Sequence, residues 1–351
     1  MENKALQNRI RYCWVDNIKT AACILVVCGH FFMSMAANNL IPSNSVFHYF
    51  INTVYTFHVQ LFFFCSGFLY QSSNRVHSIK SWGNNVIDKL INLGVPYFSF
   101  TVITLLLKII FPDNITVEAT PILKTLFIWP TAPYWYLYVL FFLYLIIPCM
   151  NSKKSASLLL AFSLTLKVMN IFLLESGIEM PYLIYSISGQ LIWFSLGMLF
   201  VYIDFKKNKT MWKIIGICFG LAAVIASIFI CSKPSISESV KFIIGLLFVL
   251  SIVIISQFTE ITAINNICRN FSKYFMPVFV MHTICAAGIR SLLFKMGIDS
   301  SLLHILIGLP AGFVFPVIIY KIMEKLPVFM FFVYPKKSIS VLKSKHSKEK
   351  L

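Results

Sequence analysis

The first apolar run of the chain reads Trp14-Val-Asp-Asn-Ile-Lys-Thr-Ala-Ala-Cys-Ile-Leu-Val-Val-Cys-Gly-His30. At about 100° per residue on a helix, Lys19 and His30 lie about 20° apart, and Asp16 lies about 40° from His30. The three side chains therefore form one polar stripe, with His30 about 16 Å beyond Lys19 along the axis. A charge in hydrocarbon is costly unless it faces a cavity or a partner, so the stripe predicts a functional site.

The composition of the whole chain indicates a membrane protein. Of its 351 residues, 58% are hydrophobic, only 12% are charged and 34 are phenylalanine. No soluble domain has this composition. The net charge of +17 lies in short runs between apolar segments, which favours a cytoplasmic membrane surface over a nucleic-acid partner. The nine cysteines stand singly, and we expect neither disulfides nor a bound metal.

Hydrophobic runs of spanning length predict an all-α bundle of about ten transmembrane helices. The predicted spans are residues 15–36, 46–70, 93–111, 134–150, 155–174, 183–203, 213–231, 239–259, 274–294 and 301–322. Basic residues are concentrated in alternate connections, which predicts that both termini are cytoplasmic. These basic residues are Arg75, Lys80, Lys89, Lys153, Lys154, Lys206, Lys207, Lys209, Lys213, Arg269 and Lys273. We therefore divide the chain into a membrane domain, 1–335, and a basic cytoplasmic tail, 336–351.

Several further segments, taken in order with the first, resemble the integral-membrane acyltransferase-3 family, and within it the fucose 4-O-acetylase-like branch. The first-helix pattern of that family is an acid, a basic residue three positions on, and a histidine after ten more residues, here Asp16, Lys19 and His30. Most members carry arginine where this chain has Lys19. The later motifs are Phe57-His-Val-Gln-Leu-Phe-Phe-Phe-Cys-Ser-Gly-Phe-Leu69, Lys89-Leu-Ile-Asn-Leu-Gly-Val-Pro-Tyr97, Trp135-Tyr-Leu and Lys273-Tyr-Phe-Met-Pro-Val-Phe-Val-Met-His282.

The resemblance implies transfer of an acetyl group from cytoplasmic acetyl-CoA to a hydroxyl of a bacterial surface polysaccharide, such as an O-antigen or capsule, or of its lipid-linked precursor. It also implies a multi-pass protein of the bacterial inner membrane. The phosphates of CoA are expected at a cationic inner mouth. The basic residues predicted there are Lys19, Lys89, Arg11 and Arg9. His30, deeper in the membrane, either takes a proton from the sugar hydroxyl or carries the acetyl group itself.

The remaining candidates each have a structural alternative. Asp16 is predicted, with His30, as a catalytic residue that pairs with Lys19 and holds it, and the alternative is a simple interfacial ion pair. His58 and His282 either line the cavity and contact the acceptor or pack against neighbouring helices. Trp135 either stacks on a sugar ring or belongs to an interfacial aromatic belt.

Two other segments also allow two interpretations. Ser66-Gly67 is most simply a close contact between helices. The long connection 112–133 either covers an outward-facing site or lies in the aromatic belt.

Two rival functions remain for the chain as a whole. Buried charges among about ten helices also describe a saccharide transporter or flippase, although no inverted repeat is evident. A membrane scaffold would leave Asp16, Lys19 and His30 without a reason to share a face. Turnover of acetyl-CoA by the purified protein separates the enzyme from both rivals.

Overall fold

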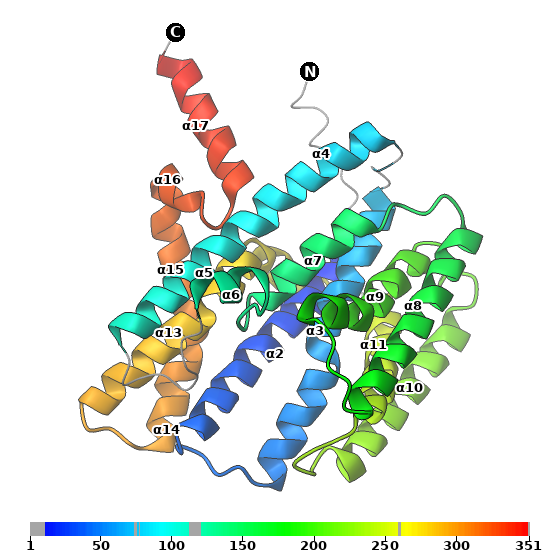
Figure 1. Cartoon of the computed structure of the whole chain (residues 1–351), viewed down its shortest axis with the longest axis horizontal. Coiled ribbons are helices and arrows are strands. Elements are labelled where there is room, and N and C mark those ends of the chain that lie inside the picture. The colour runs from blue at the N-terminus through cyan, green and yellow to red at the C-terminus, as the bar shows by residue number, and fades with distance from the viewer. Residues whose placement is uncertain (1–10, 74–75, 77, 112–120, 259–260, 350–351) are drawn as a thin grey trace.

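The computed structural model describes residues 11–73, 76, 78–111, 121–258 and 261–349, and every regular element in these ranges is a helix (Figure 1). The first half contains α2 (Cys13–Ala37), α3 (Ser45–Ser73), α4 (Ile79–Lys89), η1 (Leu90–Gly94), α5 (Val95–Ile110), α6 (Ile122–Phe127), α7 (Trp135–Ile146) and α8 (Lys153–Glu175). The second half contains α9 (Tyr182–Phe200), α10 (Lys209–Ile230), α11 (Glu238–Ser256), α12 (Thr262–Phe271), η3 (Ser272–Tyr274), α13 (Phe275–Lys295), α14 (Ser301–Leu303), η4 (His304–Gly308), α15 (Leu309–Lys325), α16 (Pro327–Met330) and α17 (Pro335–Glu349). Arg9, Arg75 and residues 112–120 lie outside the described residues.

The predicted class, a polytopic helical membrane protein, is confirmed. Among the described residues, eight helical segments are long and apolar enough to cross a membrane. They are α2, α4 to α5, α8, α9, α10, α11, α12 to α13, and α14 to α15. The other two predicted spans correspond to α3 and α7. Helix α3 has 29 residues, about 43 Å at 1.5 Å per residue, but it carries more polar side chains, and α7 is apolar but has only 12 residues.

The third predicted span begins earlier than the hydropathy suggests. Its apolar run was placed at 93–111, whereas the helix begins at Ile79 and continues through the π-helical turn η1 to Ile110. Ser78 and Ser81 form a reciprocal capping box that starts the helix. Hydropathy missed the first three turns because α4 is polar on one side, and none of its residues is buried.

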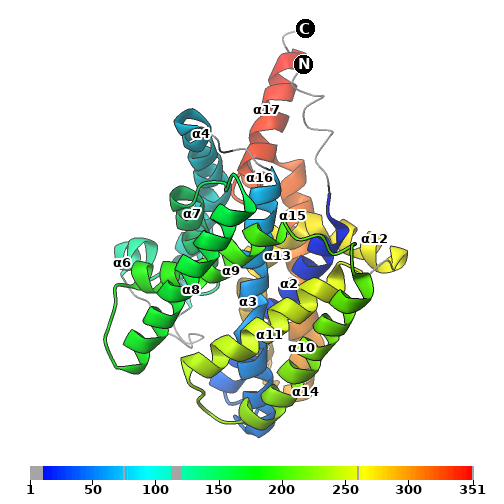
Figure 2. The same ribbon diagram turned by 90° about the vertical axis from the view of Figure 1, so that its right-hand side faces the viewer.

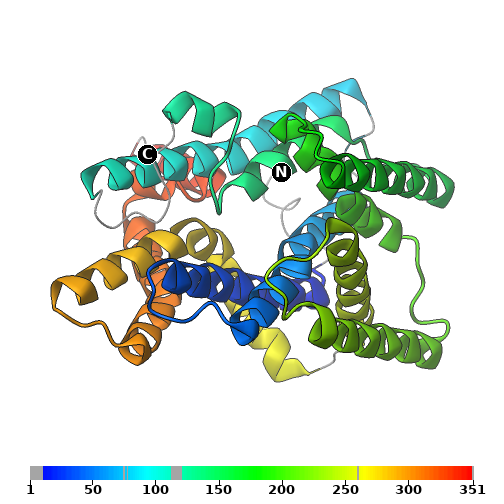
Figure 3. The same cartoon turned by 60° about the horizontal axis from the view of Figure 1, so that its bottom comes forward.

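Helices α2 and α3 form the centre of the bundle. Seen from the lower end of the molecule, they lie between the group α13 to α15 and the group α8 to α11 (Figure 3). Helix α3 meets α9 through glycines, since a Cβ on Gly67 would stand 1.9 Å from the Phe194 carbonyl oxygen and one on Gly197 would stand 2.0 Å from the Phe64 carbonyl oxygen. The interpretation of Ser66-Gly67 as a close helix contact is therefore confirmed for Gly67.

The connection between α5 and α7 folds back against α5. The hydroxyl of Tyr97 donates to the carbonyl oxygens of Thr125 at 3.2 Å and Leu126 at 2.8 Å, near the end of α6, where carbonyls lack helical partners. Tyr97 lies about 20 Å before the end of α5 at Ile110. In Figures 1 and 2, α6 accordingly lies beside the bundle and not beyond its lower end. Residues 122–127 thus pack against the side of the bundle at the level of Tyr97.

The described ends of the chain lie at one end of the bundle. Figures 1 and 2 both show α17, α4 and the start of α2 at the upper end, and the α2–α3 and α13–α14 connections at the lower end. The first turn of the basic tail is tied to the membrane domain, because Lys336 pairs with Asp88 of α4 and Lys337 pairs with Glu324 of α15 at 2.7 Å.

This arrangement supports a topology experiment. Because basic residues occupy the upper connections, reporters fused after Lys154, Lys209 and Lys345 are expected to score as cytoplasmic, and one placed near Asp113 as external. Paired phosphatase and fluorescent-protein fusions make the measurement. An external score after Lys345 would contradict the orientation of the whole bundle.

Candidate active site

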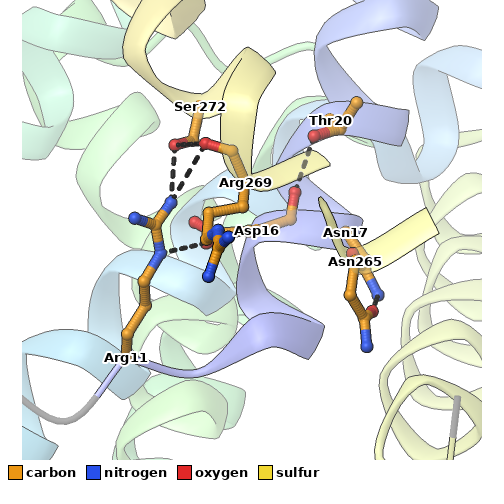
Figure 4. A network of polar contacts seen from close by, with 7 residues as sticks. All are labelled: Arg11, Asp16, Asn17, Thr20, Asn265, Arg269 and Ser272. Atoms are coloured by element: carbon orange, nitrogen blue, oxygen red, sulfur yellow. Dashed lines mark hydrogen bonds and ion pairs between the residues drawn. The ribbon is translucent and has the colours of Figure 1, made fainter. Parts of the chain in front are cut away.

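The start of α2 is held to α12 and η3 by a polar network (Figure 4). Arg11 donates from Nε to Asp16 Oδ2 at 2.6 Å and from Nη2 to Ser272 Oγ at 2.7 Å. At the next residue of α2, Asn17 Nδ2 donates to Asn265 Oδ1 of α12 at 2.7 Å. The network ties the start of α2 to the elements that precede α13.

The expected ion pair between Asp16 and Lys19 does not form among the described residues, where the carboxylate of Asp16 is paired with Arg11. Arg11 lies just before the helix and reaches the carboxylate while its second nitrogen binds Ser272, an arrangement that the compact ammonium of Lys19 cannot reproduce. Arg11, predicted to bind the donor, is thus engaged in holding the helix start, and Asp16 is its partner.

Lys19 and Lys89 are brought together from distant parts of the sequence. The Lys89 Nζ lies 3.8 Å from the ring centroid of Tyr144 in α7. Lys19 is half-buried and close enough to the same Tyr144 to interact with it electrostatically. Two of the three described cationic candidates therefore converge on one tyrosine, Tyr144.

The histidines predicted for the interior also converge, from α2, α3 and α13. The ring centroids of His30 and His282 are 5.3 Å apart. Tyr55 links the third member of this group, because its ring centroid lies 6.3 Å from that of His30 and 4.7 Å from that of His58. His58 and His282 are 2% and 1% exposed, whereas His30 is only half-buried. His30 is therefore the histidine of this cluster that a substrate can reach.

Hydrogen bonds define the tautomers of the two buried histidines. His58 Nδ1 lies 2.6 Å from the Val54 carbonyl oxygen, and His282 Nδ1 lies 3.0 Å from that of Val278. A carbonyl oxygen only accepts, so each Nδ1 carries a hydrogen and donates it, which leaves the lone pair of the neutral ring on Nε2. His30 makes no hydrogen bond to the part of the chain that the structure describes, so both of its nitrogens remain available for chemistry.

Among the described residues, the ring of Trp135 makes no contact with a histidine ring. Its ring packs on Phe63 of α3 at 6.2 Å, and the neighbouring Tyr136 is buried with its hydroxyl 3.1 Å from Ser66 Oγ. Within the described ranges, no group of three or more His, Cys, Asp and Glu side chains is placed to hold a metal ion.

Arg290 is a neighbour of the site that the sequence analysis did not single out. It lies in α13, is 8% exposed, and donates from Nη1 to Ser34 Oγ, one turn beyond His30 on α2. The signal was present, since an arginine within the predicted span 274–294 is a functional candidate by default.

Comparisons with known proteins agree with this architecture. No curated protein and no solved structure matches the chain. The family described as an acyltransferase domain, type 3, matches residues 12–321, a range that contains α2 to α13 and both clusters described above. The chain is therefore a multi-pass membrane protein that belongs to the acyltransferase-3 family.

Proposed function

We propose that this acyltransferase moves an acetyl group from cytoplasmic acetyl-CoA to a hydroxyl of a bacterial surface polysaccharide or of its lipid-linked precursor, and that it belongs to the fucose 4-O-acetylase-like branch. It would act in the bacterial inner membrane. The observation that carries the proposal is the division of α2 into two chemically different ends. At one end Lys89 lies on the ring of Tyr144, with which Lys19 interacts electrostatically. About 16 Å further along, His30 lies beside His282, and Tyr55 links it to His58.

The cationic end suits the donor. CoA carries phosphate groups, which lysine ammoniums attract most strongly where water is partly excluded. The extended pantetheine arm of a CoA bound at Lys19 and Lys89 spans the distance to His30. The thioester would then lie beside the half-buried imidazole, with the nucleotide on the cytoplasmic side where the basic connections are predicted.

The histidine end suits the transfer. A free nitrogen of His30 takes the proton of the acceptor hydroxyl while that oxygen attacks the thioester carbonyl carbon. The carbon–sulfur bond then breaks, and the CoA sulfur leaves with the proton returned by His30. A covalent route through acetyl-His30 uses the same contacts, and trapping of labelled acetyl on the protein separates the two routes.

The proposal is tested by mass spectrometry of the surface polysaccharide from cells with and without the protein. The expected result is loss of one acetyl group per repeating unit when the protein is absent. Radiolabelled acetyl-CoA supplied to inside-out membrane vesicles, which retain the native acceptor, is expected to label that acceptor. If the acceptor stays unlabelled while the saccharide moves across the membrane, the result would instead support a flippase.

Lys19 is expected to affect the donor selectively. Lys19→Arg should retain most activity, because arginine keeps the charge, whereas Lys19→Gln should raise the KM for acetyl-CoA roughly tenfold, equivalent to about 1.4 kcal/mol. Lys153→Gln is the matched control, since it removes the same charge from an exposed site at the start of α8. Steady-state transfer and direct acetyl-CoA binding are measured for all three variants. Wild-type binding by Lys19→Gln would remove Lys19 from the donor site.

A further inference from the structure

His282 differs from the other described histidines in one respect. Its Nε2 atom is buried and has no hydrogen-bond partner among the described residues, while its Nδ1 is bound to the Val278 and Phe279 carbonyl oxygens at 3.0 and 2.9 Å. A buried lone pair without a donor is costly, and such a group in a native protein calls for an explanation. The nearest imidazole in the cluster is that of His30.

The separation of the two rings matches that of a hydrogen-bonded pair. Two imidazoles joined by an N–H···N bond of about 3 Å have centroids about 5 Å apart, and the centroids of His30 and His282 are 5.3 Å apart. The bond itself is not formed, because His282 Nε2 has no hydrogen-bond partner among the described residues. Rotation about the Cβ–Cγ bond of a histidine is soft, and catalytic hydrogen bonds often tighten only when substrate binds.

The two histidines are also unequally held. His282 is fixed by its two backbone acceptors and by burial, whereas His30 is half-buried and makes no hydrogen bond to the described residues. A ring with no fixed partner has neither a defined tautomer nor a defined orientation. A hydrogen bond to the fixed lone pair of His282 would supply both.

We propose that His282 is a positioning residue for His30: its Nε2 accepts the ring hydrogen of His30 and so directs the second nitrogen of His30 at the acceptor hydroxyl. This inference rests on the proposed role of His30 as the base. When His30 takes the proton of the hydroxyl, the imidazolium donates to His282 and its charge is spread over two rings. The proton returns from His30 to the departing CoA sulfur, so no proton remains on the pair.

The geometry of His282 provides a matched pair of substitutions. In His282→Asn, the side-chain amide nitrogen takes the place of Nδ1 and keeps the backbone hydrogen bond, but nothing replaces Nε2. In His282→Gln, the amide oxygen reaches the place of Nε2 and can accept from His30. A positioning role predicts that Gln retains more activity than Asn, whereas a purely structural role predicts the reverse.

Turnover is measured with radiolabelled acetyl-CoA in inside-out vesicles. The vesicles are prepared from cells that carry only the variant. His282→Gln is expected to turn over at least about ten times faster than His282→Asn, with the KM for acetyl-CoA unchanged in both. His304→Gln is the control, because His304 is equally buried but donates to the Ile298 carbonyl and lies against Phe294. It is expected to retain wild-type turnover.

Equal turnover of the two variants at any level, or faster turnover of His282→Asn, overturns the proposal. If neither variant folds, His282→Ala provides the test. Imidazole added to the vesicles is expected to raise the turnover of His282→Ala at least tenfold. The absence of a rise overturns the proposal. Failure of the proposed function has a different outcome, namely no acetyl transfer by the wild-type protein. Loss of transfer in His30→Ala with equal turnover of the Asn and Gln variants removes only the role of His282.

Discussion

Acetyl transfer by the His30→Ala protein is expected to fall by at least about 100-fold, the lower end of what a positioned acid–base group contributes. The amount of the His30→Ala protein and its insertion into the membrane should stay near those of the wild type. His30 is half-buried and makes no hydrogen bond to the described residues, so its removal breaks no hydrogen bond of the structure. Label incorporation is measured in vesicles, and the amount of protein by immunoblot.

A control histidine makes this result specific. His48 lies near the start of α3 at the lower end of the bundle, where its Nε2 is 3.4 Å from Ser43 Oγ, and His48→Ala should transfer acetyl groups normally. Acetyl-CoA should still bind to His30→Ala, because the cationic end of α2 is unchanged. Retained transfer by a well-folded His30→Ala protein would make the histidine structural.

The second large effect is expected on the fold. In Gly67→Ala, the new methyl group would stand 1.9 Å from the Phe194 carbonyl oxygen, and the backbone of α9 cannot move aside as a flexible side chain can. Helices α3 and α9 would have to separate, at a cost of about 3 kcal/mol or more. We expect little folded protein in detergent and a lower midpoint of thermal unfolding. Gly197→Ala should behave in the same way from the opposite helix.

The chain offers a matched control for this substitution. Gly288 lies within α13, and a Cβ built on it meets no atom within 4 Å. Gly288→Ala should leave the unfolding midpoint unchanged or raise it, because alanine is favoured over glycine in a helix by up to about 1 kcal/mol. Unfolding midpoints are compared by light scattering or by tryptophan fluorescence. A stable Gly67→Ala protein would show that the helix contact is looser than described.

Local patterns in the sequence predicted much of the architecture because membrane helices are defined by length and hydropathy. Residues 15–36 and 155–174 agree closely with α2 and α8. The polar start of α4 and the packing of α6 back against α5 were missed, since neither has a hydropathy signal. The capping box at Ser78 determines where α4 begins, and the hydrogen bonds of Tyr97 to backbone carbonyls determine where α6 packs.

The candidate site was predicted only in part. The helical period of 3.6 residues placed Lys19 and His30 on one face of α2, which required no knowledge of other helices. The partner of Asp16 was predicted as Lys19 from their spacing on the helix, but Arg11 approaches the carboxylate from outside the helix. Spacing along one helix cannot predict a competitor that the chain brings in before the helix begins.

The sequence by itself thus determined the membrane class, the helical content and the polar stripe of the first helix, because these depend on hydropathy and on period within one segment. Only the tertiary structure decided that Lys89 meets Tyr144, that His30 and His282 lie 5.3 Å apart, and which helices touch through glycine. Such contacts join residues that are far apart in the chain. They depend on the packing of whole helices, which no local pattern encodes.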